Sequence, residues 1–248
     1  EAQAERGARR AALARLRALM RARGVGAYIV PTDDPHQTEH PPRCFARREF
    51  ISGFTGSAGT AVVTLREALL WTDARYFLQA PQELDAAAGW RMMKDRVPEA
   101  VPIDEYLKQH LVGGGDGDAR CRIVAVDPAL VSYSLYKRWE GSFAGSALQL
   151  QGLEENLVDL VWDARPPLPA APVFAHPLQF AGQSAAEKVA RVLGAMAEQG
   201  ARHLVVSALD EVAWLLNFRG CDVDFIPVGL CCAVVSAAAP GDGAATPE

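Results

Sequence analysis

The chain has 248 residues with a formal net charge of −5, and half of its residues are hydrophobic. This length can hold one large domain or two ordinary ones. The negative charge argues against a general nucleic-acid-binding protein, and no apolar run is long enough to predict a transmembrane helix. The five cysteines, an odd number without a CxxC pair, are expected to be reduced thiols in a cytoplasmic protein.

Residues 1–23 are rich in arginine and carry leucines at helical spacing, which predicts a helix that ends at Gly24 and Gly26. One interpretation is a mitochondrial-type targeting helix, because acidic residues are few. The other is an opening helix that packs its leucines on the domain and exposes its arginines to solvent. The second interpretation is favoured, because targeting helices follow no firm spacing rule.

The following segments alternate between strand and helix patterns, which indicates an α/β fold. Apolar and β-branched runs predict strands at 27–31, 60–64, 68–71, 90–94, 122–126 and 148–150. Amphipathic spacing predicts helices at 74–84, 103–111, 132–139 and 154–162. Thr72-Asp73 offers a cap for the first of these helices, and the glycines at 113–118 predict a flexible turn.

The clearest domain boundary is the segment ARPPLPAAP at 164–172, because its prolines cannot continue a helix or a central strand. We therefore expect a first domain at 1–163, a proline-rich linker at 164–172 and a second domain at 173–248. The second domain is predicted to contain helices at 184–199 and 209–218, a strand at 203–207 and a cysteine-rich apolar strand at 229–236.

Two short motifs suggest ligands but lack the required context. The glycine segment GFTGSAG (53–59) lacks the lysine of a phosphate-binding loop and precedes a strand, so a structural turn is favoured. His36, Glu39 and His40 fit H-x-x-E-H, an inverted zinc-peptidase motif. That chemistry needs both histidines on one helical face, and the flanking prolines leave little room for a helix, so a zinc site is disfavoured.

Longer motifs resemble a known family. They are YIVPTDDPHQTE (28–39), SGFTGSAGTAVVT (52–64), LLWTDARYFLQA (69–80) and LDEVAWLLNFRGCD (209–222). Together they resemble the N-terminal region of Xaa-Pro aminopeptidases, members of the creatinase/prolidase superfamily. This resemblance implies two creatinase/prolidase N-terminal-like α/β domains, each with a mixed sheet flanked by helices. It also implies that the second domain is incomplete and that the catalytic "pita-bread" domain is absent from this chain.

The resemblance also implies one site residue. In the family, the arginine of the WTDGRYFLQ motif contacts the peptide substrate, which points to Arg75 here, although Ala74 replaces the usual glycine. A guanidinium group suits a carboxylate or a peptide carbonyl. The alternative is a surface ion pair between Arg75 and Asp73, which contributes little to stability when exposed. No catalytic residue and no metal ligand are expected in this chain.

The function implied by the resemblance is that of a non-catalytic part of a cytoplasmic Xaa-Pro aminopeptidase. This part would shape access for short peptides with proline at the second position and would help to form a homodimer. The two metal ions of the family, usually manganese and alternatively zinc, would belong to the missing catalytic domain, so this chain alone is predicted to be inactive. A histone-chaperone-type protein-binding module of the same fold, and a creatinase or prolidase relative with another small substrate, are the alternatives.

Overall fold

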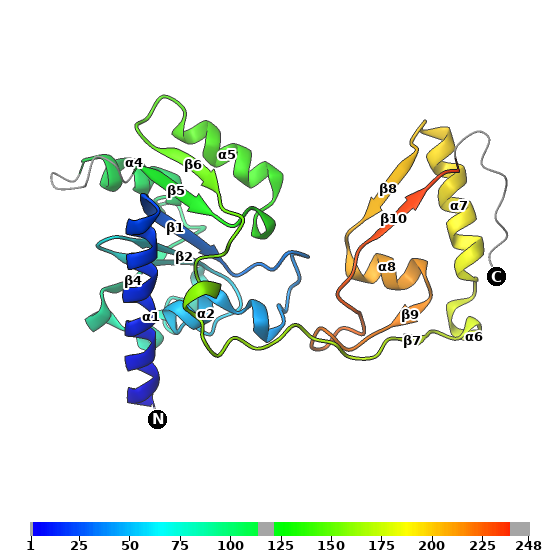
Figure 1. Cartoon of the computed structure of the whole chain (residues 1–248), viewed down its shortest axis with the longest axis horizontal. Helices are drawn as coiled ribbons and strands as arrows, with labels where there is room; N and C mark the ends of the chain where they lie inside the picture. Colours follow the sequence, from blue (N-terminus) through cyan, green and yellow to red (C-terminus); the bar gives the residue numbers. More distant parts are fainter. Residues whose placement is uncertain (1, 114–121, 239–248) are drawn as a thin grey trace. The chain divides into compact units, whose positions relative to one another are not determined.

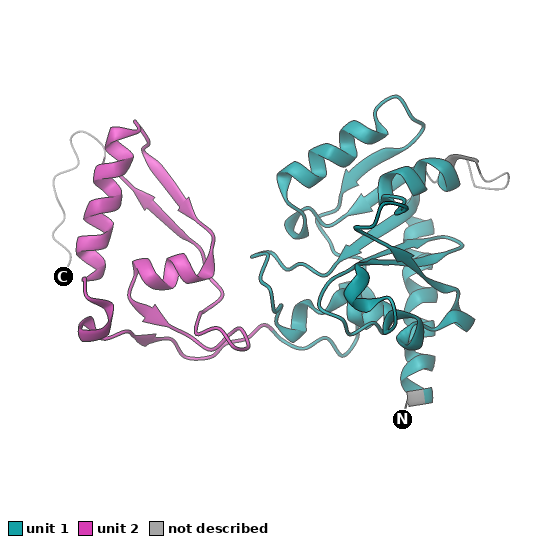
Figure 2. Ribbon diagram, turned by 180° about the vertical axis from the view of Figure 1, so that it is seen from behind, with its two compact units in different colours: residues 1–167 teal, residues 168–248 magenta. Residues whose placement is uncertain are grey.

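The computed structural model describes residues 2–113 and 122–238, and the chain divides into two compact units, Glu1–Pro167 and Leu168–Glu248 (Figure 2). The division after Pro167 lies within the proline-rich segment 164–172. Most of the glycine turn expected at 113–118 lies outside the described residues. Within the described parts of the chain, none of the helices has the length and apolar character that crossing a membrane requires.

Unit 1 is built on a six-stranded mixed sheet (Figure 1). Its strands are β1 (Val25–Pro31), β2 (Thr60–Thr64), β3 (Ala68–Thr72), β4 (Trp90–Lys94), β5 (Ile123–Val126) and β6 (Gln149–Gly152). They are ordered β4-β3-β2-β1-β5-β6; β2 pairs antiparallel with β1 and β3, and the other pairs are parallel. The six strands predicted from apolar and β-branched runs are confirmed.

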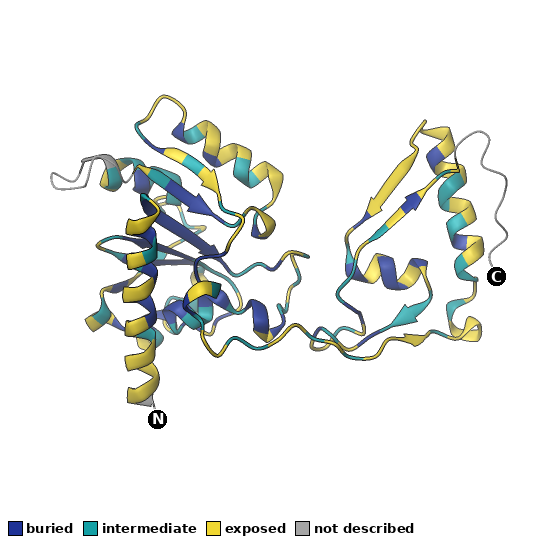
Figure 3. Ribbon diagram, in the orientation of Figure 1, coloured by how far each residue is buried: buried dark blue, intermediate teal, exposed yellow. Residues whose placement is uncertain are grey.

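Helices cover both faces of this sheet. They are α1 (Ala2–Ala22), α2 (Arg47–Ser52), α4 (Ile103–Gly113) and α5 (Tyr133–Phe143). Leu16 of α1 and Ile51 of α2 pack in one core cluster with Tyr28 of β1, whereas Leu107 of α4 packs in a second cluster with Ile29. Consecutive residues of β1 thus face opposite covered surfaces, and the whole strand is buried (Figure 3).

The arginines of α1 join the helix to the rest of unit 1. Two of them form ion pairs with distant segments, Arg10 with Asp85 and Arg15 with Asp163, and Arg23, which directly follows the helix, pairs with Glu155. Arg10 and Arg15 remain exposed, as expected for arginines left to solvent, whereas Arg17 is partly buried and donates to the carbonyl of Thr64. The apolar stripe behaves as predicted, because Leu13, Leu16 and Met20 are buried. The first helix is an integral layer of unit 1.

Short helical turns connect the main elements. They are η1 (Arg43–Phe45), η2 (Ala74–Tyr76), α3 (Ala80–Glu83), η3 (Ala86–Ala88), η4 (Pro128–Leu130) and η5 (Asp159–Val161). The continuous helix predicted at 74–84 is wrong, because Pro81 lacks an amide hydrogen and its ring obstructs the preceding turn. The predicted cap is confirmed, since the side chain of Asp73 accepts a hydrogen bond from the amide of Arg75.

The helix predicted at 154–162 is also wrong, because only η5 is helical. The amide of Leu157 donates to Tyr28 Oη at 3.1 Å, and the amide of Val158 donates to Asn156 Oδ1 at 3.0 Å. These side-chain acceptors replace the carbonyls that a helix would have used. A phenol from β1, 129 residues away in sequence, thus helps to determine the local backbone.

Unit 2 is a smaller α/β unit with two separate two-stranded sheets. Its elements are β7 (Phe174–Ala175), α6 (Leu178–Ala181), α7 (Ala185–Glu198), β8 (His203–Val206), α8 (Leu209–Leu215), β9 (Phe218–Arg219) and β10 (Ala233–Ser236). β8 pairs antiparallel with β10, and β7 pairs antiparallel with β9. The strand expected at 229–236 begins only at Ala233, so Cys232, which is exposed, lies outside the strand.

The β8–β10 sheet is covered on one face. Met196 of α7 packs there with Val206 of β8 and Val235 of β10. On the other face, Val205 and Val234 stand opposite each other in the strand register and are 66% and 61% exposed (Figure 3). The sheet of unit 1 and the β8–β10 sheet therefore differ, since strand β1 is buried on both faces and β8 on one.

Candidate functional site

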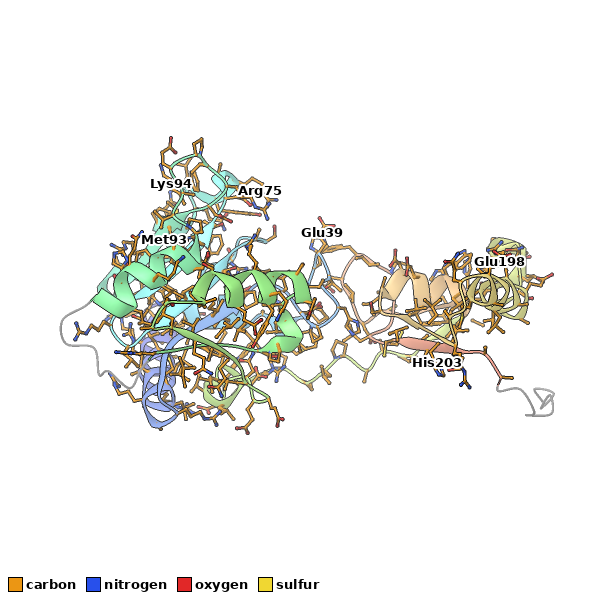
Figure 4. The ribbon with its side chains drawn as sticks, turned by 90° about the horizontal axis from the view of Figure 1, so that it is seen from above. Glu39, Arg75, Met93, Lys94, Glu198 and His203 are labelled. Carbon is orange, nitrogen blue, oxygen red and sulfur yellow. The ribbon has the colours of Figure 1, made fainter. Side chains whose placement is uncertain are left out.

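A pocket of about 400 Å³ lies at one edge of the unit 1 sheet. Its lining comes from residues 32–33 and 37–39 after β1, residues 57–60 at the start of β2, and residues 71–73, 75 and 95–96 at the ends of β3 and β4. The parallel strands β3 and β4 both deliver their carboxyl ends to this edge, and β1 ends there too because it is antiparallel to β2. Figure 4 shows Glu39 and Arg75 along the same side of unit 1.

The glycine segment 53–59 forms one wall of this pocket and is held by two strand-end threonines. Thr32 Oγ1 donates to the carbonyl of Gly59 at 2.7 Å and accepts from its amide at 3.0 Å. Thr72 Oγ1 donates to the carbonyl of Ala58 at 2.7 Å. The segment is thus a structural turn, as predicted, and it is tied to the ends of β1 and β3.

Arg48 of α2 supports the same wall from behind, and the sequence analysis did not identify it. Its guanidinium donates to the carbonyls of Phe54 at 3.2 Å and Gly56 at 2.5 Å, and the residue is only 5% exposed. Burial lowers the pKa of Arg48 to about 10. In an arginine-rich chain no local signal distinguishes this buried guanidinium from exposed ones, because its acceptors are backbone carbonyls.

Side-chain packing, in addition to hydrogen bonds, holds the glycine turn 53–59 in place. A Cβ atom added to Gly56 would overlap the rings of Phe54 and Tyr76, so glycine is required there. Those two rings meet edge to face with centroids 5.5 Å apart. Ser57 Oγ and Tyr76 Oη share a hydrogen bond of 2.6 Å. Tyr76 thereby connects the glycine wall to its neighbour in the chain, Arg75.

Arg75 lies on η2 and forms a bidentate pair with Asp73. Arg75 Nε donates to Asp73 Oδ1 at 2.9 Å, and Nη2 donates to Oδ2 at 2.8 Å. The guanidinium carbon lies 5.2 Å from the centroid of the Tyr76 ring, and the side chain of Arg75 is 62% exposed. The pair holds the guanidinium in one orientation while the Nη1 group makes no hydrogen bond to the described residues.

This geometry predicts a shifted titration of Asp73. The hydrogen bonds from Arg75 hold the pKa of the Asp73 carboxyl below its usual 3.8. Because the folded-state pKa is the lower one, the pair stabilises the fold above the unfolded-state pKa, and this contribution is lost as the pH falls through the folded-state value. We expect Arg75→Gln to raise the pKa of Asp73 toward 3.8 in a carboxyl-carbon NMR titration; an unchanged pKa would contradict the pairing.

The segment 33–40 forms a turn around a buried carboxylate. Asp34 is fully buried and accepts hydrogen bonds from the amides of His36 and Thr38 and from Thr38 Oγ1. Gln37 adopts a left-handed backbone with φ of 56°. His36, Glu39 and His40 therefore do not share a helical face. Glu39 instead lines the pocket, where burial also raises the pKa of Asp33.

Comparison with known proteins places this geometry in a family. The creatinase/prolidase N-terminal domain matches residues 13–160, and a second family of the same description matches residues 164–240. The chain belongs to the creatinase/prolidase N-terminal domain family. The predicted fold class is confirmed, and so is the resemblance to Xaa-Pro aminopeptidases.

Several relatives of this creatinase/prolidase domain chain are curated as "probable Xaa-Pro aminopeptidase P". Those of Ajellomyces dermatitidis and Neurospora crassa are 41% and 43% identical over 90% of the chain. The chain spans only 35% and 32% of their lengths. A crystal structure of the Caenorhabditis elegans X-prolyl aminopeptidase is also similar, and that protein is described as a cytosolic enzyme with a di-nuclear active site. The match has 32% sequence identity and a TM-score of 0.81, and it covers 91% of this chain and 37% of the C. elegans chain.

Within the described residues of this creatinase/prolidase domain chain, no group of three or more histidine, cysteine or acidic side chains is arranged to hold a metal ion. The residues that the structure does bring together are Arg75, Asp73 and Glu39, all on the pocket at the sheet edge. The arrangement suits binding of a polar or charged ligand by hydrogen bonds. It contains no paired nucleophile and general base among the interactions described above.

Proposed function

We propose that this chain is the N-terminal, non-catalytic part of an Xaa-Pro aminopeptidase, a metallopeptidase that removes the residue preceding proline. The observation that carries the proposal is the similarity of 90% of the chain to about a third of curated Xaa-Pro aminopeptidases P. The domains would comprise residues 1–163 and 173–248, joined by the linker 164–172. The exposed pair Val205 and Val234 supports an incomplete second domain, because apolar sheet faces are normally covered.

In this proposal the pocket of unit 1 receives part of a short peptide with proline at the second position. Arg75 would donate from Nη1 to a peptide carbonyl or carboxylate, and Asp73 would keep its guanidinium oriented toward the peptide. The wall held by Thr32, Thr72 and Arg48 would limit how much chain the pocket admits. The enzyme would be a cytoplasmic homodimer.

Two manganese ions, or zinc, would be held by residues outside this chain. When bound, such a pair activates a water molecule and polarises the scissile carbonyl. Among the described residues no fitting ligand set is found. In this proposal the chain contributes to the reaction through binding and orientation.

The proposal is tested by a peptidase assay with an Xaa-Pro tripeptide and Mn²⁺. The full-length protein that contains this chain is expected to release the first residue, and the isolated chain is expected to release none. Variant His40→Ala of the isolated chain serves as a control for the H-x-x-E-H motif. Cleavage by the isolated chain that disappears in this variant would overturn the assignment of a non-catalytic part. Absence of cleavage by the full-length protein, together with binding of protein partners, would favour the protein-binding alternative.

A further inference from the structure

A second guanidinium lines the same pocket as Arg75, and neither the motifs nor the relatives point to it. Arg96 lies two residues after the end of β4, and its side chain is 75% exposed. Its nearest carboxylate is that of Asp95, with Nε and Oδ2 3.9 Å apart. This separation exceeds hydrogen-bond length, and such an exposed pair contributes little. Within residues 2–113 and 122–238, Arg96 donates no side-chain hydrogen bond.

Arg75 and Arg96 therefore differ in what they can offer a ligand. Asp73 already occupies Nε and Nη2 of Arg75 with bonds of 2.9 and 2.8 Å. A ligand carboxylate that requires the Nε–Nη2 edge would have to break this pair, which leaves only the Nη1–Nη2 edge of Arg75. Arg96 can present two parallel donors to a ligand, and only its 3.9 Å ion pair with Asp95 would be lost. Arg96 also contributes to lowering the pKa of Asp73, so both guanidiniums act on the same end of the pocket.

The backbone of Arg96 is an independent sign of constraint. Its φ is 54°, in the left-handed region that favours glycine. A residue other than glycine keeps this conformation only where the surrounding structure enforces it. Such strained residues are concentrated at binding and active sites. Arg96 therefore holds a strained position at the pocket rim although its side chain makes no strong contact there.

The pocket is electrically asymmetric. Asp33 and Glu39 line it at the β1 side, whereas Arg75 and Arg96 line it at the β3–β4 side, where Asp73 and Asp95 each have an arginine neighbour. β4 and β1 are three strand spacings apart in the sheet order, which is about 14 Å. An anionic group is therefore repelled from the β1 side, whereas at the β4 end the two arginines offset the two aspartates.

We propose that Arg96 binds the C-terminal carboxylate of a short peptide, at the β4 end of the pocket beside Arg75. This inference rests on the proposed function, because the peptide is the ligand that function supplies. A planar guanidinium with free donors matches a carboxylate in a bidentate geometry. The pocket then favours peptides that end within it over longer or amidated ones.

The test measures binding rather than turnover. The ligand is Pro-Ala, which remains after the residue before proline is removed from a tripeptide, and its C-terminal amide is the comparison. Isothermal titration calorimetry with the full-length protein is expected to give about tenfold tighter binding of the free acid, a difference typical of one charge-assisted contact. Arg96→Gln is expected to abolish most of this preference.

Two further variants make the result specific. Arg96→Gly removes the guanidinium but suits the left-handed backbone, so it should lose the preference while remaining folded by circular dichroism. Arg66→Gln, in the turn between β2 and β3 at the opposite edge of the sheet, should keep the preference.

An equal affinity of the wild-type protein for acid and amide, or a preference that survives in Arg96→Gln, would overturn the assignment to Arg96. Failure of the proposed function appears differently, as absence of cleavage of any Xaa-Pro peptide by the full-length protein. Because the binding ratio is measured without turnover, it decides the role of Arg96 in either case.

Discussion

Replacing Asp159 with alanine is expected to lower the free energy of unfolding of unit 1 by about 3 kcal/mol. Asp159 accepts two hydrogen bonds from Arg47, at 2.7 and 2.8 Å, and one from Arg165 at 2.7 Å. The side chain of Arg47 is only 6% exposed. Removal of the carboxylate would leave this guanidinium buried without its counter-charge, and the cost of that desolvation is the source of the loss.

The measurement is urea unfolding of the isolated chain, followed by far-ultraviolet circular dichroism. Asp163→Ala is the matched control, because Asp163 pairs with Arg15 in an exposed position four residues away in sequence. An exposed pair contributes little, so this control should unfold close to the wild type. Similar unfolding midpoints for Asp159→Ala and Asp163→Ala would contradict a special role for the buried cluster.

Replacing Arg75 with glutamine is expected to lower kcat/KM of the full-length protein for an Xaa-Pro tripeptide about 30-fold. The estimate follows from the loss of one hydrogen bond from a charged donor, about 2 kcal/mol. The reason is geometric, because Asp73 holds the guanidinium so that its Nη1–Nη2 edge is left for the peptide. Steady-state kinetics with Mn²⁺ provide the measurement.

Two variants separate peptide contact from a structural role of Arg75. Asp73→Asn keeps the shape of the side chain but removes the charge that orients the guanidinium, so it should produce a smaller loss in the same direction. Arg66→Gln lies at the other edge of the sheet and should leave the kinetics unchanged. If Arg75→Gln has the kinetics of the wild type, Arg75 does not contact the peptide. Its pair with Asp73 is then a surface ion pair, the alternative given in the sequence analysis.

Local patterns were sufficient for most elements of unit 1. The β-branched run 60–64 and the apolar run 68–71 form β2 and β3, because a side-chain preference acts within the strand itself. The leucine stripe of the first helix was likewise readable, since its spacing repeats along one face. Arg75 was found through a long motif, and its placement on a pocket needed the structure.

One predicted helix failed because other partners compete for its backbone amides and side chains. The segment 154–162 has helical spacing, but Tyr28 and Asn156 capture its amides, and Arg47 binds Asp159 from 112 residues away. The buried position of Arg48 could not be predicted, because its acceptors are backbone carbonyls, and these are present at every residue whatever its side chain. Such contacts exist only once the sheet has brought the segments together.

The sequence by itself determined the alternation of strands and helices and the family, because each depends on side chains close together in the chain or on the order of long motifs. The tertiary structure alone decided which guanidiniums are free. Arg48 is buried behind the glycine wall, Arg75 is bound by Asp73, and Arg96 remains uncommitted at the pocket rim. The strand order brings the ends of β1, β3 and β4 together around one pocket, and that order is a property of long-range pairing.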